Sequence, residues 1–243
     1  MNRREALLSL GALAVSGSIS SISQAKELNS YPERTAITHE SLPNPPRKDK
    51  VWQVLIDEED RKTLAVVFDR FIPSDEYGPS ATEAGCLVFI DNQLSGDYGA
   101  GASMYLDGPY DVQNEEKIMG FPQFIATPKD RYISGLKALQ SYSHENYRKP
   151  IYELSNEQID GILSGMEDGS ISLGGTVNTK AFFELMLQNV REGYLADPIY
   201  GGNKDMVGWK MIGFPGARYD YRPYIDRRGE DLKLIPVSLV PEY

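Results

Sequence analysis

Residues 197–216 read Asp-Pro-Ile-Tyr-Gly-Gly-Asn-Lys-Asp-Met-Val-Gly-Trp-Lys-Met-Ile-Gly-Phe-Pro-Gly. Five glycines and two prolines in this stretch favour turns and positive φ angles over a regular helix or strand. Large apolar side chains, among them Trp209 and Phe214, occupy the positions between them. The stretch therefore predicts an ordered, irregular segment with aromatic anchors. Two interpretations stay open, a loop that binds another protein and a buried loop that caps a helical core.

Helix signals precede this segment. Asp57 is placed to cap a helix from Glu58 to Phe71, in which Leu64, Val67 and Phe68 follow helical spacing. Start and stop signals predict four more helices: from Pro79 to Ser95, from Thr127 to about Tyr147, from Ser155 to Gly169 and from Thr179 to Tyr194.

No stretch alternates apolar and polar residues as a half-buried strand does. The predicted fold is therefore mainly α, a single helical domain with long irregular loops and an extended, aromatic-rich C-terminal segment. One of these loops is a long surface excursion from Gly96 to Gly120, since most connections in compact domains are shorter.

Composition bounds the class of protein. The chain has 243 residues, of which 41% are hydrophobic, enough for one domain with a sizeable core. Its formal net charge of −10 argues against nucleic acid or an anionic membrane surface as the main partner, because both attract clustered Lys and Arg.

The first 25 residues have the order of an export signal. Arg3 and Arg4 precede a weakly apolar run from Ala6 to Ile22, and Ser23-Gln24-Ala25 is an acceptable cleavage site. The paired arginines predict a twin-arginine signal, cleavage after about Ala25 and a periplasmic protein. The alternative, an uncleaved membrane anchor, stays open. Twin-arginine export carries folded proteins, so this chain, or a protein that travels with it, is expected to fold before transport.

The remaining chain divides into three parts by composition. Residues 26–50 are polar and proline-rich and predict an extended tether, whereas residues 51–217 carry the helices. Residues 218–243 predict an extended tail rich in Tyr and Arg, side chains that are enriched at protein interfaces. The tail is expected to lie either along another subunit or on its own domain.

The chemistry of this chain offers little for catalysis. Cys86 is the only cysteine and is either a small buried hydrophobe or a bridge to a partner. The two histidines, His39 and His144, have no neighbouring nucleophile to activate. Residues 99–104 begin as GxG but lack the third glycine and the following helix of a dinucleotide site. No spacing indicates a metal site either, so we expect no catalytic, cofactor-binding or metal-ligating residue in this chain.

Four segments carry a resemblance to a known family: residues 64–73, 81–91, 132–139 and above all 193–216. In the last of these, Tyr-Gly-Gly-Asn is followed by Gly-Trp-Lys and Gly-Phe-Pro-Gly. On these motifs the chain resembles the gluconate 2-dehydrogenase subunit 3 family, the small subunit of membrane-associated, FAD-dependent sugar and sugar-acid dehydrogenases.

The resemblance implies a hetero-oligomeric complex of three subunits. A large flavoprotein of the glucose-methanol-choline oxidoreductase type holds FAD, and a multihaem cytochrome c subunit passes electrons to membrane quinone. The small subunit carries the twin-arginine signal, helps the flavoprotein to mature as a chaperone does, and takes it across the membrane. This chain departs from a strong export motif, because Asn2 precedes the arginines and Glu5-Ala6 follow them.

We expect five residues to face the partner subunit or to support the surface that does: Tyr200, Trp209, Phe214, Arg218 and Tyr221. Two other functions stay open at this point. One is a catalytic oxidoreductase in its own right. The other is a stand-alone periplasmic sugar-binding module, in which Trp209 and the tyrosines stack on sugar rings.

Overall fold

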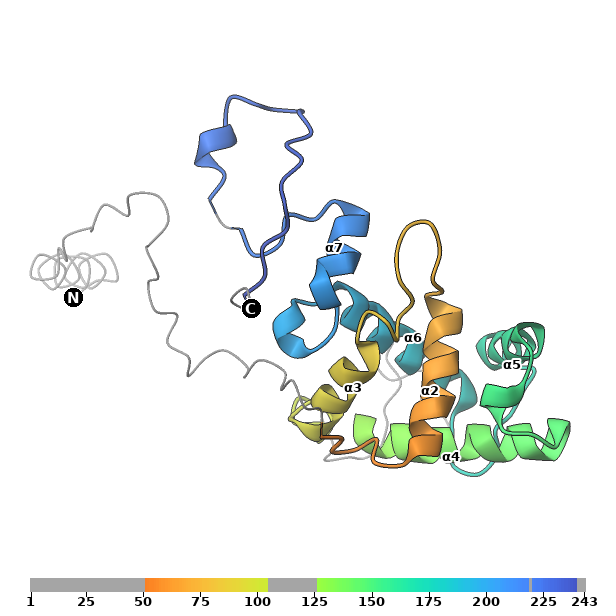
Figure 1. Cartoon of the computed structure of the whole chain (residues 1–243). Helices are drawn as coiled ribbons and strands as arrows, with labels where there is room; N and C mark the ends of the chain where they lie inside the picture. Colours follow the sequence, from red (N-terminus) through yellow and green to blue (C-terminus); the bar gives the residue numbers. More distant parts are fainter. Residues whose placement is uncertain (1–50, 105–125, 219, 240–243) are drawn as a thin grey trace, which may run out of the picture. The chain divides into compact units, whose positions relative to one another are not determined.

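The computed structural model describes residues 51–104, 126–218 and 220–239. These residues contain no strand and six α-helices: α2 (Glu58–Phe71), α3 (Cys86–Ser95), α4 (Pro128–Tyr147), α5 (Asn156–Asp168), α6 (Thr179–Leu195) and α7 (Val207–Ile212) (Figure 1). The predicted mainly α fold is confirmed. The predicted signal, the tether, His39 and most of the excursion from Gly96 to Gly120 lie outside the described residues.

Three helix starts follow the predicted capping chemistry. The Asp57 side chain accepts a hydrogen bond from the Glu59 amide at 2.9 Å at the start of α2. Thr127 before α4 and Ser155 before α5 each form a complete capping box, in which side chain and backbone exchange hydrogen bonds. Local sequence therefore fixes where these helices begin.

Helix α3 begins at Cys86, seven residues after the predicted start at Pro79. Gly85 adopts a left-handed conformation with φ of 84°, which interrupts a helical path from Pro79. Asp69 of α2 also binds the amide of Thr82 at 2.8 Å and its hydroxyl at 2.7 Å. The turn before α3 is thus held by α2, a contact distant in sequence.

Helix α6 is the centre of the helical unit, because it packs against α2, α3, α4, α5 and α7. Phe182, Met186 and Val190 on α6 are buried, as are the predicted core residues Leu64 and Val67 of α2. This position lets the end of α6 support the segment that follows it, residues 196–216.

The segment before α2 is held through a buried carboxylate. Asp91 of α3 is fully buried and accepts hydrogen bonds from the backbone amides of Gln53, Val54 and Leu55, the shortest at 2.8 Å. Successive backbone amides of this kind make a concave site for an anion. Asp91 therefore attaches the start of the domain to α3.

Residues 220–225, which contain a single turn of 3-10 helix (Arg222–Tyr224), belong to a separate compact unit from the helices. Within this unit Arg222 forms an ion pair with Asp220 at 2.7 Å, which lowers the pKa of the Asp220 carboxyl to about 2.

Candidate interaction site

The chain after α6 folds back over the end of that helix and along α3. Lys204 donates its amide to the carbonyl of Ala84 at 3.0 Å, and Asn92 donates its side-chain amide to the carbonyl of Tyr200 at 3.3 Å. The segment is irregular, as predicted, with 3-10 turns at Pro198–Tyr200 and Lys204–Met206. The short helix α7 within it was not predicted.

Asn203 closes this segment into a loop. Its buried side chain donates to the carbonyl of Ala196 at 2.8 Å and accepts from the amide of Gly208 at 2.8 Å. Its φ is 46°, a left-handed conformation that Asn tolerates better than most residues. The sequence contained a signal for this role, an Asn directly after two glycines, but the reasoning from sequence assigned it none.

Two glycines of the loop contact the backbone of α6. A Cβ atom at Gly202 would lie 2.1 Å from the carbonyl oxygen of Gly193, and one at Gly208 would lie 2.0 Å from that of Tyr194. No side chain fits at either position. The amide of Gly208 donates to Asn203, and that of Gly201 donates to the Pro198 carbonyl at 2.9 Å. Gly202 and Gly208 thus allow the loop to pack closely against α6. The backbone amides of Gly201 and Gly208 are both hydrogen-bonded within the chain.

Trp209 supports the loop from inside. Its side chain is 5% exposed, and its Nε1–H donates to the carbonyl of Leu195 at 2.7 Å. The ring of Phe214 meets it edge to face at 5.3 Å between centroids, and Phe214 is itself 44% exposed. Trp209 therefore positions Phe214, which reaches the surface.

The tail returns to the loop. The amide of Ala217 donates to the carbonyl of Val237 at 2.7 Å, and the amide of Val237 donates to the carbonyl of Pro215 at 3.3 Å, which makes an isolated parallel bridge. The part of the predicted tail around Val237 thus lies on its own domain.

Asp197 and Arg218 also hold the tail. The Asp197 carboxylate accepts from the hydroxyl of Ser238 at 2.8 Å and from the amide of Leu239 at 2.9 Å. Arg218 donates Nη2–H to the carbonyl of Ile235 at 2.9 Å. Asp197 is a second residue that reasoning from sequence missed, and its position before Pro198 signalled only a local turn.

Apolar side chains are exposed on both the loop and the tail. Along the tail, Ile235, Val237 and Leu239 are exposed, whereas the residues between them are half-buried. Eight of the fourteen large hydrophobic side chains that are exposed in the described residues lie on residues 195–217 and 226–239. We call these eight the C-terminal apolar surface: Leu195, Tyr200, Met211, Ile212, Phe214, Ile235, Val237 and Leu239.

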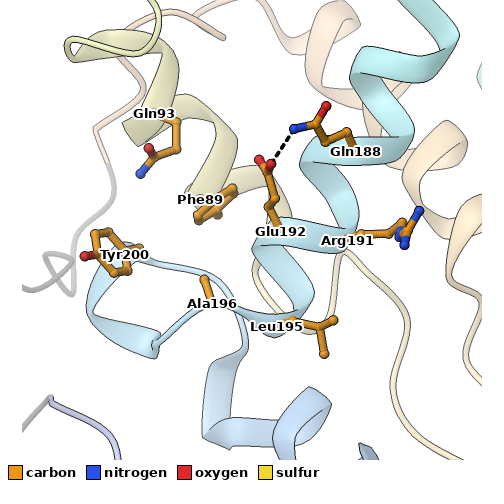
Figure 2. Close-up of a pocket in the computed structure, with 8 residues that line it drawn as sticks. All are labelled: Phe89, Gln93, Gln188, Arg191, Glu192, Leu195, Ala196 and Tyr200. Atoms are coloured by element: carbon orange, nitrogen blue, oxygen red, sulfur yellow. Dashed lines mark hydrogen bonds between the residues drawn. The ribbon is translucent and has the colours of Figure 1, made fainter. Parts of the chain in front are cut away.

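A cavity of about 830 Å³ lies between α3, α6 and the turn at Tyr200 (Figure 2). Leu195 and Tyr200 of the C-terminal apolar surface are among its lining residues. Figure 2 shows the carboxylate of Glu192 beside the amide of Gln188, which donates to it at 2.7 Å. The side-chain amide of the buried Asn189 donates to the other carboxylate oxygen at 2.9 Å.

Neither Cys86 nor His144 lines this cavity. Cys86 is buried, as one of the two interpretations held, and burial raises the pKa of its thiol to about 12. His144 is exposed in the last turn of α4. Within the described ranges, no group of three or more His, Cys, Asp or Glu side chains is arranged to hold a metal ion. No described helix is long and apolar enough to span a membrane.

Among the five predicted site residues, Trp209 and Phe214 are in contact, and Arg218 follows the bridge that joins loop and tail. Tyr200 lines the cavity. Tyr221 is 41% exposed and belongs to the separate unit of residues 220–225. The assignment of these residues to a partner-facing surface stays a prediction.

Comparison with curated proteins and with solved structures found no match. A family model, described as gluconate 2-dehydrogenase subunit 3, matches residues 58–216. The match spans the helices from α2 to α7 and ends at Gly216, where the loop meets the tail. Because it covers more than half of the chain, this protein belongs to the gluconate 2-dehydrogenase subunit 3 family.

Proposed function

We propose that this chain is the non-catalytic small subunit of a periplasmic, membrane-associated dehydrogenase that oxidises gluconate or a related sugar. It binds the FAD-containing large subunit, supports its maturation and carries it through the twin-arginine export machinery. FAD and haem c are held by the partner subunits. Family membership supports the coarser part of this proposal, that the chain is a subunit of a dehydrogenase complex.

The observation that carries the proposal is the C-terminal apolar surface. Exposed apolar side chains that gather on one part of a soluble protein commonly mark a binding site for another protein. Here they lie at the end of α6, on the loop, whose backbone is fixed by Asn203, Gly208 and Trp209, and on the tail that returns to it. The apolar side chains that remain outside are therefore available to a partner.

Expression of the flavoprotein with and without this chain tests the proposal. We expect that, without the chain, the flavoprotein has a lower FAD content and little activity in the periplasm. A flavoprotein with unchanged FAD content and unchanged periplasmic activity would rule out both the maturation and the export roles.

A variant of this chain that lacks residues 1–25 separates the two roles. It is expected to support FAD incorporation in the cytoplasm but not export. Affinity purification of the tagged small subunit tests whether a cytochrome c subunit belongs to the complex. We expect the haem c absorbance to appear in the same purified fractions as the small subunit.

A further inference from the structure

Three cations lie at the C-terminal apolar surface. Lys210 precedes Met211 on α7, Lys233 is two residues before Ile235 on the tail, and Arg218 donates to the Ile235 carbonyl. None of the three forms an ion pair within the described residues, although the whole chain carries a net charge of −10.

The carboxylates that lie close to the tail are hydrogen-bonded to neutral donors. Asp197 accepts from Ile199, Ser238 and Leu239, and Asp231 accepts from the backbone amide of Lys233. The side chains of Lys210, Arg218 and Lys233 therefore carry charges that no ion pair within the described residues balances.

Arg218 also has an unused donor. Its Nε–H group is buried and has no hydrogen-bond partner among the described residues, while Nη2 is fixed by the carbonyl of Ile235. A buried donor on a charged group without an acceptor destabilises a structure, and such groups are rare in folded proteins. Nε–H is enclosed by the chain itself and Nη2 is engaged, so a carboxylate of a partner would meet the charge and the remaining donors of the half-buried guanidinium.

We propose that the C-terminal apolar surface binds a protein face that is apolar and carries a carboxylate opposite Arg218. This inference rests on the proposed function, under which that protein is the flavoprotein subunit. The apolar side chains of loop and tail supply buried area, and Arg218 selects the acidic group, with Lys210 and Lys233 at the edge.

Two other partners could cover an exposed apolar surface, a second copy of this chain or a membrane, and charge disfavours both. A second copy of this chain, docked through the same surface, would bring two sets of the cations Lys210, Arg218 and Lys233 into one interface. An anionic membrane would attract these three cations but repel a chain whose net charge is −10.

The exposed edge of the tail is also a poor template for an added strand. Pro236 has no backbone N–H, so a partner strand cannot form a continuous ladder along residues 234–238. Recognition is thus through the side chains of Ile235, Val237 and Leu239 and through Arg218.

Co-expression of the tagged full-length chain with the flavoprotein subunit, followed by affinity purification, tests this surface. Ile212→Asp and Arg218→Glu are each expected to lower the flavoprotein recovered by about tenfold or more, as loss of a central contact does. Ile133→Asp and Lys180→Glu are matched controls, since Ile133 on α4 and Lys180 on α6 are exposed outside this surface. These controls are expected to change recovery by less than about twofold.

Arg218→Lys guards against an unfolding artefact. It keeps the charge but removes the planar pair of donors, so it is expected to weaken recovery less than Arg218→Glu does while leaving the melting temperature unchanged. If the Ile212→Asp and Arg218→Glu variants both recover as much flavoprotein as the unaltered chain, the C-terminal apolar surface is not the binding site, although the proposed function stands. If the unaltered chain recovers no flavoprotein, the proposed function fails, and this inference fails with it.

Two further measurements address the other occupants. The isolated chain is expected to be monomeric by light scattering and not to sediment with phosphatidylglycerol vesicles. A dimer, or vesicle binding, that Ile212→Asp abolishes would overturn the proposal in favour of self-association or a membrane.

Discussion

The side-chain amide of Asn203 makes two hydrogen bonds inside the protein. Its NH2 group donates to the carbonyl of Ala196, and its oxygen accepts from the backbone amide of Gly208. Replacement by Ala leaves the carbonyl and the amide without partners in a buried place. We expect Asn203→Ala to lower the free energy of unfolding by about 2–3 kcal/mol, measured by urea denaturation. Asn146→Ala on α4 is the control, because Asn146 is exposed and donates only to Tyr142 of its own helix. Equal effects of the two substitutions would contradict a special role for Asn203.

Cys86 donates weakly to the carbonyl of Val190 and is fully buried. Because burial raises the pKa of its thiol to about 12, the thiol is protonated near neutral pH and unable to act as a nucleophile. We expect the native chain to react very slowly with a disulfide reagent such as DTNB and the chain in concentrated guanidinium chloride to react at once. Rapid reaction of the native chain would show that the thiol is reachable after all.

At the level of elements, helices α2 and α5 are joined by a bidentate ion pair. Arg70 donates Nε–H and Nη2–H to the two carboxylate oxygens of Asp160, at 2.7 and 2.6 Å. The hydrogen bonds from Arg70 lower the pKa of the Asp160 carboxyl below its ordinary value of 3.8. A carboxyl with a lowered pKa in the folded state stabilises the fold above its ordinary pKa. This stabilisation is lost as the pH falls through the lowered value.

We therefore expect Asp160→Asn to reduce stability at about pH 7 and to make no difference at strongly acidic pH. The effect is expected to be less than about 1 kcal/mol, because both side chains are partly exposed and water screens their interaction. Urea denaturation of both proteins at several pH values measures it. A constant difference between the two proteins from neutral to acidic pH would show that the ion pair does not cause the effect.

Some helix starts depend only on residues nearby in the sequence, whereas others depend on distant residues. The starts of α2, α4 and α5 were predictable because a capping side chain lies within three residues of the groups it binds. The start of α3 was not, because it depends on Asp69 of another helix. Helix α7 and the return of the tail depend on Gly208 against Tyr194 and on Asp197 against Ser238. The position of the loop and of its aromatic residues was therefore predictable from the sequence, whereas the polar side chains that hold the loop were not, because their partners lie elsewhere in the chain.

On the scale of the whole molecule, the helical unit acts as a support for one loop and one tail. Helix α6 lies in the middle of the helices and ends at Leu195, whose carbonyl accepts from Trp209. The loop thus begins on the best-packed element of the fold. A rigid base of this kind reduces the conformational entropy that the loop would otherwise lose on binding a partner.

The proposed export role makes the first residues of the chain decisive for a second protein. Arg3 and Arg4 belong to this chain, and the flavoprotein is proposed to cross the membrane only while bound to it. We expect Arg3→Lys with Arg4→Lys to keep both proteins in the cytoplasm, with FAD still bound to the flavoprotein. The two conservative changes keep the positive charge, so a general loss of charge at the N-terminus does not explain the result. Cell fractionation with activity measurement in each fraction checks this expectation. Periplasmic flavoprotein in the doubly substituted strain would mean that the flavoprotein reaches the periplasm without this signal.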